Sequence, residues 1–264
     1  MTSVEHLRIK LFADGAELEQ VAALCQNPLI QGFTTNPTLM RKANVQDYRA
    51  FATQFLELAA SRPVSFEVLS DDFQEMEHQA HELASWGSGV YVKIPVTNTR
   101  GQFAGPLINR LSAAGVKLNV TALLTLPQVR AVADCLSDRA ECTISVFAGR
   151  IADTGRDPVP MMTEAVRMLS SQPHVELLWA SPRELLNIIQ ADAMGCHIIT
   201  ATPDVLAKLP LIGKDLDVFS LETVQMFYRD ASKSGLTIAT STRTRHSAAA
   251  SMAAASELSA SVKS

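Results

Sequence analysis

The chain has 264 residues, 47% of them hydrophobic but only 6% aromatic, so it can bury a large and mainly aliphatic core. A formal net charge of −4 at pH 7 provides no basic face for nucleic acid. No apolar run is long enough to span a membrane, and charged residues interrupt the opening segment where a signal peptide would lie. We therefore expect a cytoplasmic protein without nucleic-acid or membrane partners.

Short apolar segments alternate with longer amphipathic ones along the chain, a pattern typical of repeated βα units. It predicts strands at residues 9–13, 32–34, 64–68, 90–94, 118–121, 143–147, 176–180 and 198–201. It predicts helices at residues 16–26, 46–61, 73–86, 106–114, 126–138, 160–170, 183–194 and 203–209. Eight such units predict a single (β/α)8 barrel, or TIM barrel, with a doubly wound open sheet as the competing arrangement.

The chain continues beyond the eighth unit. Apolar residues at helical spacing predict one extra helix over residues 218–234, whose apolar face needs a partner surface on its own barrel or on another subunit. We therefore expect a homo-oligomer. The barrel domain with this helix is predicted to span residues 7–236, and the Ser/Ala-rich residues 237–264 are expected to form a flexible, disordered tail.

The cysteines give no sign of a metal centre or of disulfides. Cys25, Cys135, Cys142 and Cys196 are scattered through apolar surroundings without CxxC spacing. This distribution is typical of small core residues in a reducing compartment.

One lysine lies where lysine is rarely found. Lys93 falls inside the apolar, β-branched run of residues 89–95, which reads as a buried parallel strand. Burying an unpaired ammonium is costly, so the fold must supply a carboxylate partner or tolerate a lysine whose pKa is lowered. A neutral amine attacks carbonyls, so this position predicts Schiff-base chemistry.

Other polar residues follow the predicted strands, where the active site of a parallel barrel is built. They are Asp14, Asn36, Glu67, Asn119, Thr121, Ser145, Arg150, Ser181 and Arg183. Because the carboxyl ends of all the strands meet at one mouth of a barrel, we expect these side chains to surround Lys93.

Four motifs carry a family resemblance: FADGA at residues 12–16, GFTTNPT at residues 32–38, VKIP at residues 92–95 and NVT at residues 119–121. Together they resemble the transaldolase family, including its short fructose-6-phosphate-aldolase-like branch. The resemblance implies a (β/α)8 barrel with a Schiff-base lysine at Lys93. It also implies transfer of a dihydroxyacetone unit between sugar phosphates in the pentose phosphate pathway, without metal or organic cofactor.

The resemblance assigns roles to the polar residues. Asp14 suits the base that takes the proton of the ketose C4 hydroxyl, although it could simply cap the following helix. Glu67 and Thr121 would hold a water for proton transfer, whereas the alternative for Glu67 is a purely structural ion pair with Lys93. Asn36 and Asn119 can bind substrate hydroxyls, or can be turn and strand-end asparagines.

The remaining candidates bind substrate. Arg150, Ser181 and Arg183 suggest a phosphate site of forked donors at a helix start, although Arg183 could pair with Glu184 or Glu176 on the surface instead. By resemblance, Ser145 contacts the dihydroxyacetone unit.

Two positions separate transfer from cleavage. The aldolase branch has a tyrosine in place of Phe147 and a glutamine in place of Glu67, and this chain has the residues of transaldolases. Phenylalanine cannot protonate the carbanion intermediate, so we predict transfer. The alternatives are a fructose-6-phosphate-aldolase-like lyase and, from another class, a non-covalent sugar-phosphate isomerase with Glu67 as its base.

Overall fold

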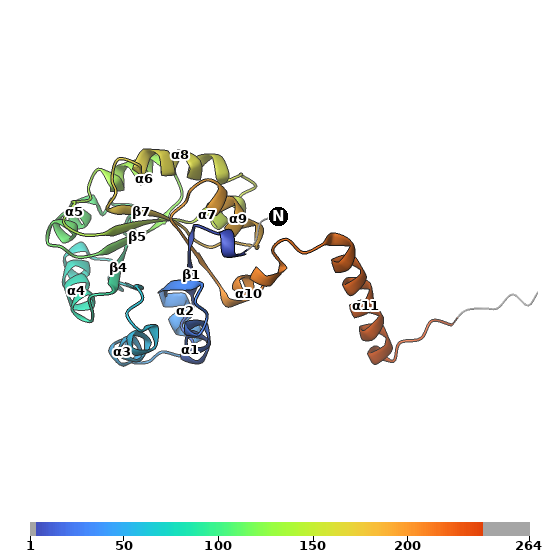
Figure 1. The fold of residues 1–264 in the computed structure, drawn as a ribbon. Helices are drawn as coiled ribbons and strands as arrows, with labels where there is room; N and C mark the ends of the chain where they lie inside the picture. Colours follow the sequence, from blue (N-terminus) through green and yellow to red (C-terminus); the bar gives the residue numbers. More distant parts are fainter. Residues whose placement is uncertain (1–3, 240–264) are drawn as a thin grey trace, which may run out of the picture. The chain divides into compact units, whose positions relative to one another are not determined.

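The computed structural model describes residues 4–239, and its centre is a closed parallel barrel (Figure 1). The strands are β1 (Lys10–Asp14), β2 (Ile30–Thr34), β3 (Val64–Glu67), β4 (Val90–Pro95), β5 (Leu118–Leu123), β6 (Cys142–Val146), β7 (Val175–Trp179) and β8 (Ile198–Ala201). Each strand pairs in parallel with the next, and β8 pairs with β1. The predicted barrel is confirmed. The open sheet is excluded, because the pairing of β8 with β1 leaves no strand at an edge.

Helices surround the barrel (Figure 1). They are α1 (Leu18–Cys25), α2 (Pro37–Lys42), α3 (Tyr48–Ala59), α4 (Phe73–Ser85), α5 (Gly105–Ala113), α6 (Leu126–Ala133), α7 (Ala148–Ala152), α8 (Val159–Leu169), α9 (Leu186–Ala193) and α10 (Pro203–Leu206), with 3-10 turns η1 (Val4–His6) and η2 (Leu209–Leu211). The sequence did not predict α2 and α7, because 6 and 5 residues are too few to show a helical period. Both follow strand ends and so border the barrel mouth.

Local sequence explains where several helices begin. Thr125 forms a capping box with Gln128 at the start of α6. Asp72 accepts hydrogen bonds from the backbone N–H groups of Gln74 and Glu75 at the start of α4. These caps satisfy backbone donors that the first helical turn leaves unpaired.

The strands are buried on both faces, as expected of a parallel sheet covered by helices. All 5 residues of β6 are buried. The core is mainly aliphatic, with an aromatic group around Phe55 and Phe66 between β3 and the α3–α4 layer. Such a frame holds the strand ends rigidly, which is what a site built from many strands requires.

One row of paired residues crosses the barrel from end to end. Glu67 pairs with Lys93, Lys93 with Asn119, Asn119 with Thr143, and Thr143 with Glu176. Strands in a closed barrel are tilted and staggered, so a row of paired positions passes from one end of the barrel to the other. Glu67 therefore lines the cavity at the carboxyl end, whereas Glu176 lines a pocket at the amino end.

A second compact unit begins at Lys214 and contains α11 (Leu216–Ser234). This helix confirms the predicted extra helix, and Asp215 caps its first turn. Its large apolar side chains are exposed, among them Leu221, Val224 and Phe227. The predicted tail lies outside the described residues from residue 240 onward, and the predicted domain boundary stays a prediction.

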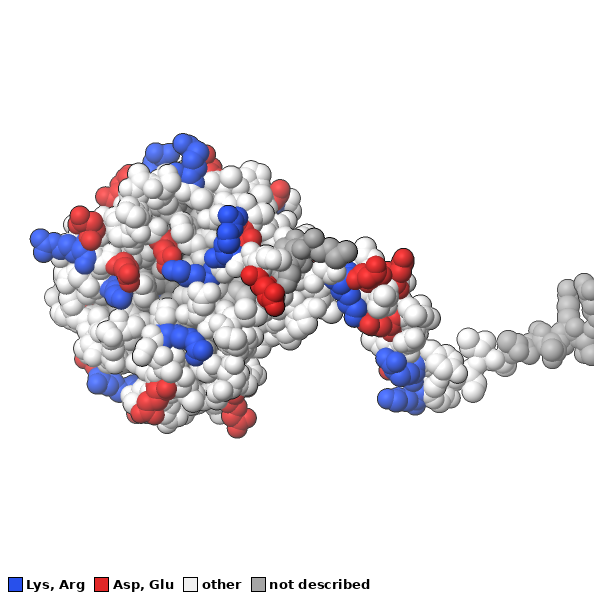
Figure 2. Space-filling model, viewed as in Figure 1, with Lys and Arg blue, Asp and Glu red and all other residues white. Residues whose placement is uncertain are grey.

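Two surface properties bear on partners. No helix within residues 4–239 combines the length and apolar character needed to cross a membrane. Figure 2 shows basic and acidic residues interspersed over the visible face of the barrel.

Candidate active site

The carboxyl ends of the strands enclose a cavity of about 700 Å³. It brings together all the candidate residues from the sequence: Asp14, Asn36, Glu67, Lys93, Asn119, Thr121, Ser145, Phe147, Arg150, Ser181 and Arg183. They come from strands far apart in the sequence, so only closure of the barrel makes them neighbours.

Lys93 lies in the wall of this cavity, with only 6% of the residue exposed. Its Nζ lies 3.1 Å from Oε2 of Glu67 on the adjacent strand and donates a 2.8 Å hydrogen bond to the backbone carbonyl of Thr35. Of the two ways to accommodate a buried lysine, the fold supplies the carboxylate partner. The same carboxylate is close enough to take a proton from the amine.

Asp14 ends β1 and faces the same cavity. It accepts a 2.8 Å hydrogen bond from Thr34 Oγ1, which lies 2.6 Å from Thr200 Oγ1. Burial raises the pKa of the Asp14 carboxyl above its ordinary value, while the charge of Lys93 and the Thr34 hydrogen bond oppose that shift. A carboxylate with a raised pKa accepts a proton more readily, which suits a general base.

Thr121 has a hydroxyl that no group in the described part of the chain satisfies. Its Oγ1 is buried, yet has no hydrogen-bond partner among residues 4–239. The next residue, Ala122, has a φ of 66°, and the pairing of β5 with β6 shifts register between Val120 and Leu123. A bulge of this kind redirects side chains beside a site, and it leaves the Thr121 hydroxyl available to a bound molecule.

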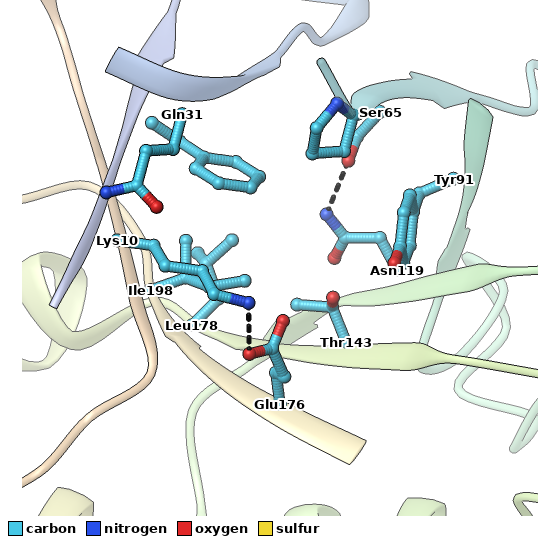
Figure 3. Close-up of a pocket in the computed structure, with 11 residues that line it drawn as sticks. Lys10, Gln31, Ser65, Tyr91, Asn119, Thr143, Glu176, Leu178 and Ile198 are labelled. Carbon is cyan, nitrogen blue, oxygen red and sulfur yellow. Dashed lines mark hydrogen bonds and ion pairs between the residues drawn. The ribbon is translucent and has the colours of Figure 1, made fainter. Parts of the chain in front are cut away.

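A buried polar chain runs through Asn119, the residue that pairs with Lys93 across β4 and β5. Ser145 Oγ donates to Oδ1 of Asn119 at 2.6 Å. The Asn119 amide in turn donates to Oγ of Ser65 at 3.0 Å (Figure 3). Asn119 also lines a smaller pocket at the amino end, where Lys10 and Glu176 form an ion pair (Figure 3). Asn119 is therefore held at both ends of its amide.

Asn36 has a structural role, but as a helix cap and not as the turn or strand-end asparagine that was its alternative. Its side-chain oxygen caps α2 by accepting from the backbone N–H of Leu39 at 3.0 Å. The residue nevertheless lines the cavity, so it is positioned by the helix that it begins.

The candidate phosphate residues meet at one side of the mouth. Arg150 lies over the ring of Phe147, 5.5 Å from its centroid. Arg183 pairs with Asp153, with Nε donating to Oδ1 at 3.0 Å, so the alternative partners Glu184 and Glu176 were wrong. Asp153 is the C-cap residue of α7, 30 residues from Arg183 in the chain, and no local pattern in the sequence brings the two together.

One expectation about this region was wrong. Ser181 does not begin a helix, because α9 starts only at Leu186. Ser181 has a φ of 57°, and Asn187 Oδ1 binds the backbone N–H groups of Arg183 and Glu184 outside any helix. An anion here would meet side chains and this turn, and not the positive end of α9.

Sequence reasoning missed two cavity residues and one residue that supports the cavity wall from below. Thr34 and Thr200 link β2 and β8 beside Asp14, and Ser65 supports Asn119. Thr200 interrupts the apolar run of the eighth strand, as Lys93 does in the fourth, and this signal could have identified it.

Known proteins resemble this chain in sequence. The transaldolase/fructose-6-phosphate aldolase family model matches residues 11–261. A "Probable transaldolase" from Dehalococcoides mccartyi is 31% identical over 202 residues, covering 76% of this chain and 90% of that protein. Another from Methanococcus maripaludis is 33% identical over 218 residues, covering 80% of this chain and 95% of that protein.

Solved structures share the fold. The crystal structure of 2,3-dimethylmalate lyase, of the PEP mutase/isocitrate lyase superfamily, superimposes with a TM-score of 0.52 over 98% of this chain and 99% of that chain, at 13% identity. At that identity only the barrel architecture is shared. The family match over most of the chain and the two relatives above 30% identity show that this chain belongs to the transaldolase/fructose-6-phosphate aldolase family.

Proposed function

We propose that this protein is a transaldolase that moves a dihydroxyacetone unit from a ketose phosphate to an aldose phosphate through a Schiff base on Lys93. The observation that carries the proposal is a buried amine 3.1 Å from the carboxylate of Glu67, in a cavity that Asp14 also lines. We place the reaction in the cytoplasm and in the pentose phosphate pathway. The four free cysteines support a reducing compartment.

The covalent step begins when Lys93 passes a proton to Glu67 and attacks the C2 carbonyl of the ketose. The carbinolamine then loses its hydroxyl as water, with Glu67 returning the proton, and an iminium forms. Thr121, whose buried hydroxyl has no partner among the residues that the structure describes, would hold the water that serves this exchange.

Cleavage then requires a base. Asp14 takes the proton of the C4 hydroxyl, the C3–C4 bond breaks, and its electrons move into the iminium to give an enamine on Lys93. The aldose phosphate product leaves. The enamine carbon next attacks the aldehyde of the acceptor while Asp14 returns its proton to the new hydroxyl, and water releases the product from Lys93.

Phe147 favours transfer over release of dihydroxyacetone. Release needs a proton donor at the enamine carbon, and Phe147 borders the cavity without a hydroxyl.

Arg150 and Arg183 would bind the phosphate of donor and acceptor, with Ser181 beside them. Arg183 would then exchange part of its pairing with Asp153 for the phosphate.

The decisive experiment is borohydride reduction in the presence of fructose 6-phosphate, followed by mass mapping. A reduced three-carbon or six-carbon adduct on Lys93 supports the proposal, and its absence favours the non-covalent isomerase. Added erythrose 4-phosphate should then yield sedoheptulose 7-phosphate. Accumulation of free dihydroxyacetone instead would identify the lyase.

We also propose that the protein forms homo-oligomers through α11. The apolar residues Val218, Leu221, Val224 and Phe227 are exposed along this helix, and such a face is typical of a surface that pairs with another copy. Sedimentation equilibrium measures the mass in solution, and a monomer at micromolar concentration would contradict this part of the proposal.

A further inference from the structure

The backbone of Glu67 lacks its ordinary sheet partners on the side of β2. The β2–β3 pairing covers only two residue pairs, and its last bond runs from the N–H of Thr35 to the carbonyl of Ser65 at 3.2 Å. In a continued parallel ladder, the N–H of Glu67 would donate to the carbonyl of Thr35, and the N–H of residue 37 to the carbonyl of Glu67.

Both continuations are replaced by other contacts. Residue 37 is a proline, which has no N–H, and it begins α2. The carbonyl of Thr35 accepts the 2.8 Å hydrogen bond from Lys93 Nζ. The two backbone groups of Glu67 therefore need a different partner.

The hydroxyl of Tyr48 is that partner. It donates to the Glu67 carbonyl at 3.0 Å and accepts from the Glu67 N–H at 3.0 Å. One side chain thus takes the place of both missing ladder contacts, and the Thr35 carbonyl stays turned toward Lys93.

Tyr48 is itself held firmly. It is the first residue of α3, behind the cap Asp47, and its ring meets Phe66 and Trp86 edge-on at centroid distances of 6.0 and 5.4 Å. Burial raises the pKa of its hydroxyl, although the Glu67 backbone contact opposes the shift, so the proton needed for donation is retained at neutral pH.

We infer that Tyr48 is a positioning residue for the chemistry at Lys93, which acts by fixing the backbone from which the Glu67 carboxylate extends. The inference rests on the proposed function. Small displacements of a proton-transfer group cost large factors in rate, so kcat and not KM is the parameter that this residue controls.

The test is a double-mutant cycle on transfer from fructose 6-phosphate to erythrose 4-phosphate. Tyr48→Phe should lower kcat about tenfold with KM nearly unchanged. In a Glu67→Gln background, the same change should lower kcat less than about twofold, because the group that Tyr48 positions has already been removed. Equal losses in both backgrounds, or no loss in either, would overturn the inference.

Tyr91→Phe is the matched control. Tyr91 lies at the amino end of the barrel, and its hydroxyl donates to the side chain of Glu141 and not to the backbone of Glu67. Removing this hydroxyl should change kcat less than about twofold in either background.

A second variant covers the case in which Tyr48→Phe does not fold. A fluorinated tyrosine at position 48 keeps the packing but ionises at lower pH, so kcat should fall on the alkaline side as donation to the Glu67 carbonyl is lost. The same analogue at Tyr91 should produce no alkaline loss. An unchanged alkaline profile at pH values where ultraviolet absorbance shows that the phenol at position 48 has ionised would also overturn the inference.

Failure of the inference and of the proposed function are distinguishable. If the unaltered protein forms a reduced adduct at Lys93 and Tyr48→Phe behaves like Tyr91→Phe, only the role of Tyr48 is wrong. If the unaltered protein forms no adduct, the proposed function fails. Amide hydrogen exchange at Glu67, which should accelerate in Tyr48→Phe but not in Tyr91→Phe, then tests the contact alone.

Discussion

Glu67 Oε2 lies 3.1 Å from Lys93 Nζ, and the two residues are directly paired across β3 and β4. The pairing fixes their distance through the backbone of two adjacent strands, so neither side chain depends on a loop. This contact is the structural ion pair that the sequence left as an alternative. It is also the geometry that proton transfer requires, so only variants can separate the two roles.

Replacing Glu67 by glutamine should slow the covalent step. The amide keeps the size and one acceptor oxygen, but it cannot take the proton of Lys93, so kcat should fall about 10²-fold. The rate of borohydride trapping with fructose 6-phosphate should fall by a similar factor. Glu176→Gln is the control, because it makes the same change in the same paired row at the opposite end of the barrel. Similar losses in both variants would contradict a catalytic role for Glu67.

Replacing Asp14 by asparagine should lower activity but raise stability. Its pKa is raised by burial, so the folded protein binds this proton more tightly than the unfolded chain does. The stability that the protonated form contributes is present below the unfolded pKa and is lost as pH rises through the folded value. Asp14→Asn should therefore be more stable than the unaltered protein at pH 7, with the difference narrowing in acid, and its kcat should fall about 10²-fold or more.

Urea unfolding at several pH values and a pH–rate profile measure these effects. The acid limb of kcat/KM should lie above the ordinary aspartate pKa of about 3.9. It should be absent from the residual activity of the variant. A variant less stable than the unaltered protein at pH 7 would show that the Asp14 carboxylate is a net stabilising group.

Phe147 should control the choice between transfer and release. Phe147→Tyr adds a proton donor at the cavity wall, so the share of free dihydroxyacetone should rise relative to sedoheptulose 7-phosphate. Phe147→Leu removes the ring without adding a proton donor and should leave the product ratio nearly unchanged. Quantifying both products in one reaction decides the matter, and identical ratios in all three proteins would refute the argument about the missing donor.

Gly149 should be indispensable to the phosphate side of the mouth. A Cβ at this position would lie 1.5 Å from the Ser181 carbonyl oxygen and 3.4 Å from Arg183 Nε. Gly149→Ala must displace the turn that carries both candidates, so KM for fructose 6-phosphate should rise about tenfold or more. Gly15→Ala is the control, since nothing lies within 4 Å of its Cβ. An unchanged KM in Gly149→Ala would show that this turn does not bind the substrate.

The sequence by itself determined the alternation of strands and helices, because burial period and helix caps are local properties. It also determined which polar residues stand at strand ends, since a lysine in an apolar strand such as Lys93, or a motif such as TTNPT, is visible without any contact. In a parallel barrel those ends share one mouth, so the candidate cavity residues could be predicted together.

The tertiary structure alone decided how those residues are held. Asp153 reaches Arg183, and Tyr48 reaches the backbone of Glu67, from segments 30 and 19 residues away. Ser181 lies in a turn and not at a helix start because Asn187 binds the backbone ahead of α9. No local period encodes such contacts. They depend on which segments barrel closure brings together and on which backbone groups the sheet leaves unpaired.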